Sequence, residues 1–181
     1  MLIAMSEAPP PSLQVRRRTH RVTVKRDQYK FSCAHMTVFP DGIKERLHGH
    51  NYQLGLELEL AAVDFARMLP FAAIKDCLAG LCLELRERVL IAEHNPLTTV
   101  IRVDAHEVEL TVCGKRYVFP REDVVLLPID NVSVEALASH LGDRILASLG
   151  PSLAPGVVTA LDVWVSESPG QGATCRLELG P

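Results

Sequence analysis

The sequence predicts an α+β fold in which helices cover one face of an antiparallel sheet. Residues 52–60 alternate strictly between apolar and polar side chains, which is typical of a half-buried strand with one wet face. After Pro70 the period changes, because apolar residues from 71 to 89 recur at helical spacing. The predicted elements follow the order β-β-α-hairpin-α-β-β, so the helices are expected to lie together on one side of the sheet.

The remaining strands are predicted at the two ends of the chain. Apolar residues between about 19 and 34 predict a first strand with a break around Asp27. Two late strands, 157–168 and 173–179, flank a turn at Pro169 and Gly170. Together with 52–60, these segments supply the expected sheet.

A second helix and an extra hairpin are predicted between the first helix and the late strands. Residues from about 102 to 119 favour a hairpin whose turn is formed by Cys113 and Gly114. Asn131 is a candidate N-cap for a helix that continues to Leu149, where Gly150 and Pro151 follow. The segment AEHNPL, residues 92–97, is expected to be a turn.

Composition limits the function classes. A chain of 181 residues with 48% hydrophobic content suits one domain, here 19–181, with an insertion at about 98–128 and a flexible leader over 1–18. A net charge of -3 gives no support to nucleic-acid binding. Five scattered cysteines argue against a disulfide framework and fit a reducing, cytoplasmic setting. No apolar run approaches the roughly 18 residues of a membrane span.

The segment RLHGHNY predicts a metal site. His48 and His50 are two residues apart, so on an extended chain their imidazoles share one face. His35, at the end of the preceding strand, offers a third imidazole. Three neutral histidines with an open position are the ligand set of a catalytic zinc. The alternative is that His48 and His50 are solvated residues of a turn.

Five motifs in order along the chain carry a family resemblance. FSCAH, RLHGHNY, EHNPL, NVSVEALA and VSESP resemble the 6-pyruvoyl-tetrahydropterin synthase and 6-carboxy-tetrahydropterin synthase family, from about residue 20 onward. The resemblance implies a tunnelling fold, a four-stranded antiparallel sheet with two helices on one face that assembles through its edges into a barrel. It also implies a cytoplasmic homohexamer with active sites between subunits and a small-molecule pterin substrate.

The resemblance also implies roles for single residues. The family's zinc ligands match His35, His48 and His50, and its pterin-anchoring carboxylate matches Glu167. The family's catalytic Asp-His pair matches Glu93 and His94, with glutamate in place of aspartate. Two positions near the family's pterin pocket match Ser133 and Glu135, at the start of the second predicted helix. Alternatively, Glu167 is an exposed charge at the end of a strand. Ser133 and Glu135 also suit the N-terminus of a helix without any further function.

The main departure from the family lies just before the HGH motif. The catalytic cysteine of the pattern CxxxHGH falls on Lys44, and Glu45 follows, giving ExxHGH. This resembles the branch that cleaves 7,8-dihydroneopterin triphosphate to 6-hydroxymethyl-dihydropterin, with glutamate in place of cysteine. Glu45 would then carry the proton, with a pKa raised toward neutrality by burial. The alternative pairs Glu45 with Lys44 or Arg46 on a solvated loop.

Other interpretations remain open at this point. Cys33 shares the face of His35, so it is a candidate nucleophile or extra ligand, or simply a small apolar core residue. A cupin-type oxygenase needs a glutamate four or five residues after the second histidine, where this chain has Leu54 and Gly55. A non-catalytic pterin- or purine-binding zinc protein and a structural zinc module are further alternatives.

Overall fold

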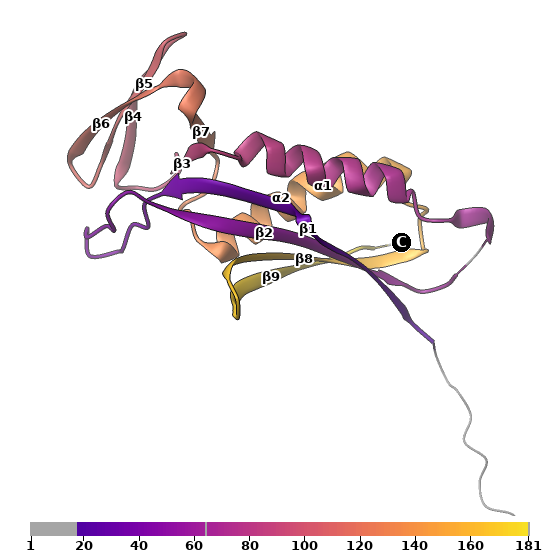
Figure 1. Cartoon of the computed structure of the whole chain (residues 1–181). Helices are drawn as coiled ribbons and strands as arrows, with labels where there is room; N and C mark the ends of the chain where they lie inside the picture. Colours follow the sequence, from indigo (N-terminus) through magenta and orange to yellow (C-terminus); the bar gives the residue numbers. More distant parts are fainter. Residues whose placement is uncertain (1–17, 64, 181) are drawn as a thin grey trace, which may run out of the picture.

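The computed structural model describes residues 18–63 and 65–180; the predicted leader, 1–18, lies almost entirely outside these residues. Two sheets form the architecture (Figure 1). The main sheet has six strands in the order β7-β3-β1-β2-β8-β9, and a smaller sheet has the order β4-β5-β6. No helix in the described part of the chain is long and apolar enough to cross a membrane.

The centre of the main sheet is an antiparallel pair of long strands. β1 (His20–His35) pairs with β2 (His48–Leu60), and the register shifts between Lys25 and Lys30. This irregularity is the break predicted around Asp27. β8 (Val158–Ser168) and β9 (Gln171–Glu178) extend the sheet beyond β2, with Gly170 at a φ of 82° in the turn between them.

The prediction of a four-stranded antiparallel sheet is wrong, because the sheet has six strands and is mixed. β3 (Arg88–Ala92) runs parallel to β1, and β7 (Val124–Leu127) runs parallel to β3. The predicted helix 71–89 is too long, because its last two residues, Arg88 and Val89, belong to β3. The chain leaves the helix after Leu85, since Arg86 is extended and Glu87 has a positive φ of 57°.

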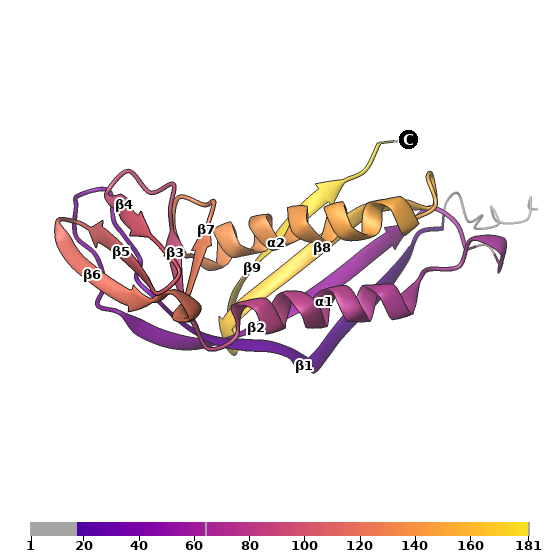
Figure 2. The same ribbon diagram turned by 90° about the horizontal axis from the view of Figure 1, so that it is seen from above.

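Two helices lie side by side on one face of the main sheet, as predicted (Figures 1 and 2). They are α1 (Phe71–Leu85) and α2 (Val134–Leu149), and each turns its apolar stripe toward the buried face of β1, β2 and β8. The predicted N-cap at Asn131 is wrong. Ser133 caps α2, its hydroxyl accepting a hydrogen bond from the Ala136 amide at 3.3 Å.

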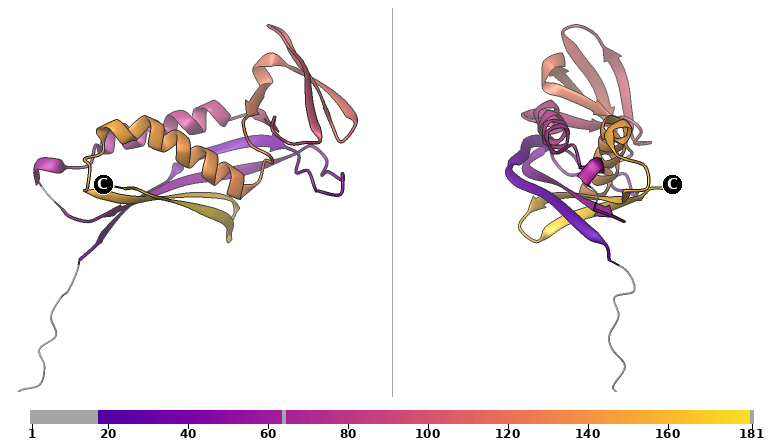
Figure 3. Two further views of the ribbon diagram at one scale, coloured as in Figure 1. Left: turned by 180° about the vertical axis from the view of Figure 1, so that it is seen from behind. Right: turned by 90° about the vertical axis from the view of Figure 1, so that its right-hand side faces the viewer.

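The predicted hairpin is present but belongs to a three-stranded sheet. β5 (Glu107–Val112) and β6 (Lys115–Pro120) meet at Cys113 and Gly114, both with positive φ, and β4 (Thr98–Val103) adds a third strand. This small sheet stands at one end of the molecule (Figures 1 and 3). Its inner face packs on the segment after β1 and on β3 and β7, forming a second core of Met36, Val38, Ile91, Val108, Leu110, Val112 and Val124.

Candidate active site

Three histidines meet at one end of the central strand pair. His35 lies directly opposite His48 in the antiparallel register, and His50 follows two residues later on the same face of β2. The ligating atoms of the three imidazoles all lie within 4.8 Å of one another. The sequence-based grouping of His35, His48 and His50 is therefore matched by the strand geometry.

The hydrogen bonds of the cluster fit a bound metal ion. The Nε2 atoms of His48 and His50 are 3.0 Å apart. Two nitrogens on one tetrahedral zinc are separated by about 3.3–3.4 Å, given Zn–N bonds of about 2.0–2.1 Å. The Nδ1 atom of His48 lies 2.8 Å from the Arg46 carbonyl and donates to it, which leaves the Nε2 lone pair free for a metal.

His35 is the buried member of the cluster, with 3% of its surface exposed. The pKa of His35 is lowered to about 4, chiefly by burial and in addition by the neighbouring His48 and His50. Below that value the ring would protonate, so near neutral pH it is the uncharged imidazole that a metal requires. The donor set fits zinc.

Tyr52 belongs to the site and was missed in the sequence. Its hydroxyl lies 3.1 Å from Nε2 of His35, and burial raises the pKa of Tyr52. Tyr52 is two residues beyond His50 on the same face of β2, so the spacing that identified the histidines also contained this signal.

Glu45 lies beside the histidines but is not buried. Its Oε2 atom is 3.9 Å from Nε2 of His48, and its side chain is 43% exposed. The side chain of Thr37 forms a hydrogen bond with the carboxylate and lowers the pKa of Glu45. The expected rise of this pKa is therefore wrong for the single chain, because contact with Thr37 outweighs burial. The predicted alternative, a carboxylate paired with Lys44 or Arg46, is not what the structure shows either.

Glu93 and His94 occupy the predicted turn after β3. Backbone hydrogen bonds fix both residues, from the Glu93 amide to the Leu127 carbonyl at 3.0 Å and from the His94 amide to the Ile129 carbonyl at 3.1 Å. His94 is exposed. Within 18–63 and 65–180, no hydrogen bond or ion pair joins either side chain to the three histidines. Asn95 holds the turn, donating from Nδ2 to the Asp130 carbonyl at 2.6 Å.

Glu167 lies at the end of β8, next to a register shift between Ser166 and Ser168. Gln53 pairs with Ser166, so continuing that register sets Glu167 opposite Tyr52. Glu167 also lines a cleft of about 720 Å³. The carboxylate expected to hold the pterin is thus on the strand next to β2, opposite a residue two positions after His50.

Ser133 and Glu135 open α2. Ser133 is the N-cap described above, and hydrogen bonds from the Glu135 amide and from the Ser133 side chain lower the pKa of Glu135. The hydrogen bonds of the two side chains are therefore those of a helix N-terminus.

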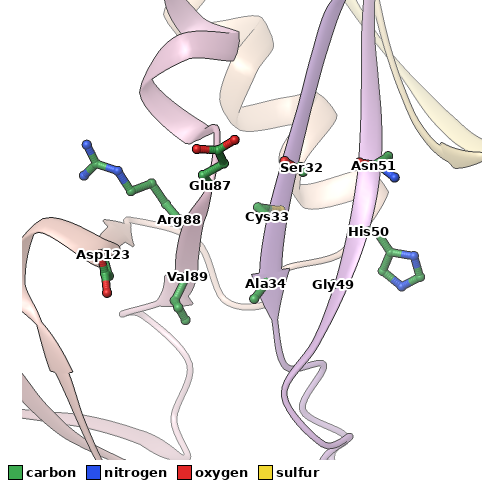
Figure 4. A pocket seen from close by; sticks show the side chains of 10 residues that line it. All are labelled: Ser32, Cys33, Ala34, Gly49, His50, Asn51, Glu87, Arg88, Val89 and Asp123. Atoms are coloured by element: carbon green, nitrogen blue, oxygen red, sulfur yellow. The ribbon is translucent and has the colours of Figure 1, made fainter.

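Cys33 pairs with His50 across the strands but lies outside the metal-binding group. Its side chain is 6% exposed, and burial raises its pKa to about 12. It lines a cavity of about 430 Å³ between β1 and β3, shown in Figure 4 with Glu87, Arg88 and Asp123. A thiol in this state behaves as an apolar core residue.

The fold and the site together define an α+β protein with a cluster of three histidines that could hold a metal ion and an adjacent carboxylate. The chain matches the family model described as 6-pyruvoyl tetrahydropterin synthase over residues 23–178, and it belongs to that family. The predicted resemblance is thereby confirmed.

Individual relatives are similar over most of the chain. A protein of Methanocaldococcus jannaschii named "Putative 6-carboxy-5,6,7,8-tetrahydropterin synthase" is 29% identical over 151 residues, 83% of this chain and 91% of the relative. The crystal structure of 6-pyruvoyl tetrahydropterin synthase from Plasmodium vivax has a TM-score of 0.81 and 26% identity, covering 90% of this chain and 99% of the other. A variant of that Plasmodium vivax protein, with a catalytic glutamate changed to alanine, has the same TM-score and coverage at 25% identity.

Proposed function

We propose that this protein is a zinc-dependent lyase that cleaves the side chain of 7,8-dihydroneopterin triphosphate, or of a related dihydropterin, to form 6-hydroxymethyl-dihydropterin. The observation that carries the proposal is the position of Glu45, whose carboxylate lies 3.9 Å from the metal-facing nitrogen of His48. The family supplies the pterin chemistry, and this chain has Lys44 where the catalytic cysteine is expected. The catalytic glutamate of the Plasmodium vivax relative supports the same exchange of a thiol for a carboxylate.

His35, His48 and His50 would hold the zinc ion. When bound, zinc supplies Lewis acidity that lowers the pKa of the side-chain hydroxyls of the substrate. The chain contributes the orientation of the ligands, through the Arg46 carbonyl on His48 and the Tyr52 hydroxyl on His35.

Glu45 acts as the base and then as the acid. It takes the proton from the side-chain hydroxyl whose carbon leaves as an aldehyde, the bond between the first and second side-chain carbons breaks, and the electron pair passes into the pterin ring. Glu45 then returns a proton to the carbon that stays on the ring, which becomes the hydroxymethyl group. A carboxylate can carry this proton in both directions, so no thiol is required.

The other predicted residues complete the proposal. Glu167 accepts hydrogen bonds from the pterin ring N–H and its exocyclic amine, because a carboxylate has two acceptor oxygens side by side. The strand register sets it opposite Tyr52, near the histidines. Glu93 and His94 serve proton transfer in a site formed between subunits, with Ser133 and Glu135 beside the pterin pocket. This arrangement requires a homo-oligomer, for which we propose a cytoplasmic hexamer.

The exposure of Glu45 favours a second candidate function. A carboxylate that is solvent-accessible and already stabilised by Thr37 is a weaker base than a buried one. The same fold and histidines could then belong to a zinc protein that binds a pterin or purine without turnover.

Product analysis separates the two candidates. The zinc-loaded protein is incubated with 7,8-dihydroneopterin triphosphate, and the products are identified by mass spectrometry. We expect 6-hydroxymethyl-dihydropterin from wild type and at least a roughly hundredfold lower rate from Glu45→Gln, which keeps the shape but not the basicity.

Glu122→Gln is the matched control, because Glu122 is an exposed glutamate of the segment after β6 that lines neither the histidine cluster nor the cleft. Its rate should equal that of wild type. Binding of the substrate without any product, in wild type as in Glu45→Gln, would favour the non-catalytic candidate.

A further inference from the structure

Lys44 stands where the family has its nucleophile, yet its ammonium contacts the backbone of Glu45 and an aromatic ring of the small sheet. The Nζ atom donates to the Glu45 carbonyl at 2.9 Å and lies over the ring of Tyr117 in β6, 5.2 Å from the ring centroid. We propose that Lys44 and Tyr117 are positioning residues, which hold the backbone of Glu45 so that its carboxylate faces the metal site. This inference rests on the proposed function of Glu45.

The segment between β1 and β2 is fixed on both sides of Glu45. On one side, the Glu45 amide donates to the Thr37 carbonyl at 2.9 Å, and Lys44 forms a single antiparallel bridge with Val38. Asn131 clamps Val38 in turn, accepting from its amide at 3.1 Å and donating to its carbonyl at 2.9 Å. On the other side, the Glu45 carbonyl is held only by the Lys44 ammonium among the contacts of the described chain.

The small sheet supplies the surface on which Lys44 rests. The rings of Tyr117 and Phe119 stack with centroids 5.9 Å apart and planes 8° from parallel. Tyr117 pairs with Leu110, which is fully buried in the second core together with Val38. The small sheet therefore packs, through this second core, against both the ring under Lys44 and the segment that leads to Glu45.

A cation over an aromatic face is attracted to the ring at this distance. The attraction restricts the Lys44 side chain, so the hydrogen bond to the Glu45 carbonyl persists and limits rotation of the Glu45 backbone. A shift of about 1 Å in a proton-transfer group lowers a rate far more than it lowers binding of the substrate. Loss of the ring or of the charge should therefore reduce kcat while KM stays nearly constant.

The test compares two pairs of variants by their steady-state rates on 7,8-dihydroneopterin triphosphate. Tyr117→Leu and Lys44→Met should each lower kcat about tenfold, with KM and bound zinc within about twofold of wild type. Tyr117→Phe keeps the ring and Lys44→Arg keeps the charge, so both should stay within about threefold of wild type. A second lysine over an aromatic ring, Lys25 at 5.1 Å from Trp164, provides the control Lys25→Met, which should match wild type.

Hydrogen exchange of the Glu45 amide gives a readout that does not depend on turnover. Tyr117→Leu should speed this exchange about tenfold and Tyr117→Phe should leave it unchanged. Unchanged exchange and unchanged kcat in Tyr117→Leu and Lys44→Met would overturn the inference, as would equal losses in Tyr117→Phe and Tyr117→Leu. If wild type turns over no pterin, the proposed function fails, and the exchange rates alone decide whether Lys44 and Tyr117 hold Glu45.

Discussion

Three imidazoles whose ligating atoms lie within 4.8 Å of one another repel when protonated, so the cluster is stable only as neutral rings or around a cation. The low pKa of His35 favours its neutral state, and the hydrogen bond from Nδ1 of His48 to the Arg46 carbonyl selects the tautomer whose Nε2 carries the lone pair. The three side chains therefore bring candidate ligand atoms close enough together to share one ion. This is the local property on which the metal assignment depends.

Removal of one imidazole should abolish tight zinc binding. We expect His48→Ala and His50→Ala each to lower zinc affinity by roughly a hundredfold or more, because two remaining ligands cannot fix a tetrahedral ion. Zinc content after dialysis against a competing chelator, measured by plasma mass spectrometry, checks this. His106→Ala removes an exposed histidine of the turn between β4 and β5 and should bind zinc like wild type. Retention of zinc by His48→Ala would contradict the assignment.

Cys33 should be inert in the folded protein. Its side chain is 6% exposed, so a reagent cannot reach the sulfur without local unfolding. After treatment with iodoacetamide near pH 7.5, peptide mapping should find Cys33 and Cys82 unmodified in native protein and alkylated in denaturant. Rapid labelling of Cys33 in the native state would instead revive its role as a relocated nucleophile.

At the scale of elements, the two helices are joined by an ion pair as well as by apolar packing. Arg144 of α2 donates from both terminal nitrogens to the Glu84 carboxylate of α1, at 3.0 and 2.8 Å. Arg144 lowers the pKa of Glu84. A carboxylate with a lowered folded-state pKa stabilises the fold above its unfolded pKa, and this contribution is lost as the pH falls through the folded value.

A double-mutant cycle should reveal this pair. Both side chains are partly exposed, so we expect a coupling between Glu84→Gln and Arg144→Gln of only about 0.3–1 kcal/mol at pH 7 and low salt. The coupling should weaken from pH 7 to pH 3, as the pH falls toward the lowered pKa of Glu84, and shrink in high salt. Urea unfolding at the two pH values measures it. A coupling that persists unchanged at pH 3 would show that the pair is not electrostatic.

The helices and strands that could be predicted from the sequence were those with one buried face and one solvent-exposed face. β2 was evident because Leu54, Leu56 and Leu58 alternate with polar residues, and α1 because its apolar stripe repeats at helical spacing. β3 and β7 escaped prediction because VLIA and VVLL are short apolar runs in a parallel pairing, without any alternation. At residue 89 such a run is indistinguishable from one more turn of helix.

Of the candidate site, the histidines could be predicted from the sequence and the surroundings of Glu45 could not. The histidines followed from the two-residue period of strands, since His35, His48 and His50 lie on regular β1 and β2. The surroundings of Glu45 could not be predicted in this way. Thr37 contacts Glu45, Asn131 contacts Val38 and Tyr117 contacts Lys44 only because residues 36–47 fold against the small sheet. The roles of Glu93, His94 and Glu167 stay predictions, since a single chain brings neither Glu93 nor His94 to the histidines.

At the scale of the whole molecule, the segment around the site exposes apolar side chains. Phe39, Ile43 and Leu47 of the segment that carries Glu45 are exposed, as is Leu97 after the Glu93–His94 turn. Exposed apolar groups gathered beside a site are typical of an interface. The two edge strands of the main sheet, β7 and β9, also leave backbone groups available for pairing.

We expect a hexamer whose assembly depends on this surface. Mass photometry should give about 119 kDa, six chains of 19.9 kDa. Ile43→Asp should shift the population to smaller species and lower activity, because a charge replaces an apolar group that is 62% exposed in the single chain. Leu83→Asp, at a residue of α1 that is 67% exposed, is the control and should assemble normally. A monomer at micromolar concentration would contradict the expectation of shared active sites.

The central claim is that Glu45, beside three metal-binding histidines, carries the proton in a carbon–carbon cleavage. Turnover of 7,8-dihydroneopterin triphosphate in D₂O, followed by mass spectrometry of the pterin product, tests it most directly. The account predicts 6-hydroxymethyl-dihydropterin with one deuterium on the hydroxymethyl carbon, delivered from the exchanged carboxyl group of Glu45. A pterin that keeps its three-carbon side chain after losing triphosphate would contradict it, since that product requires elimination instead of cleavage.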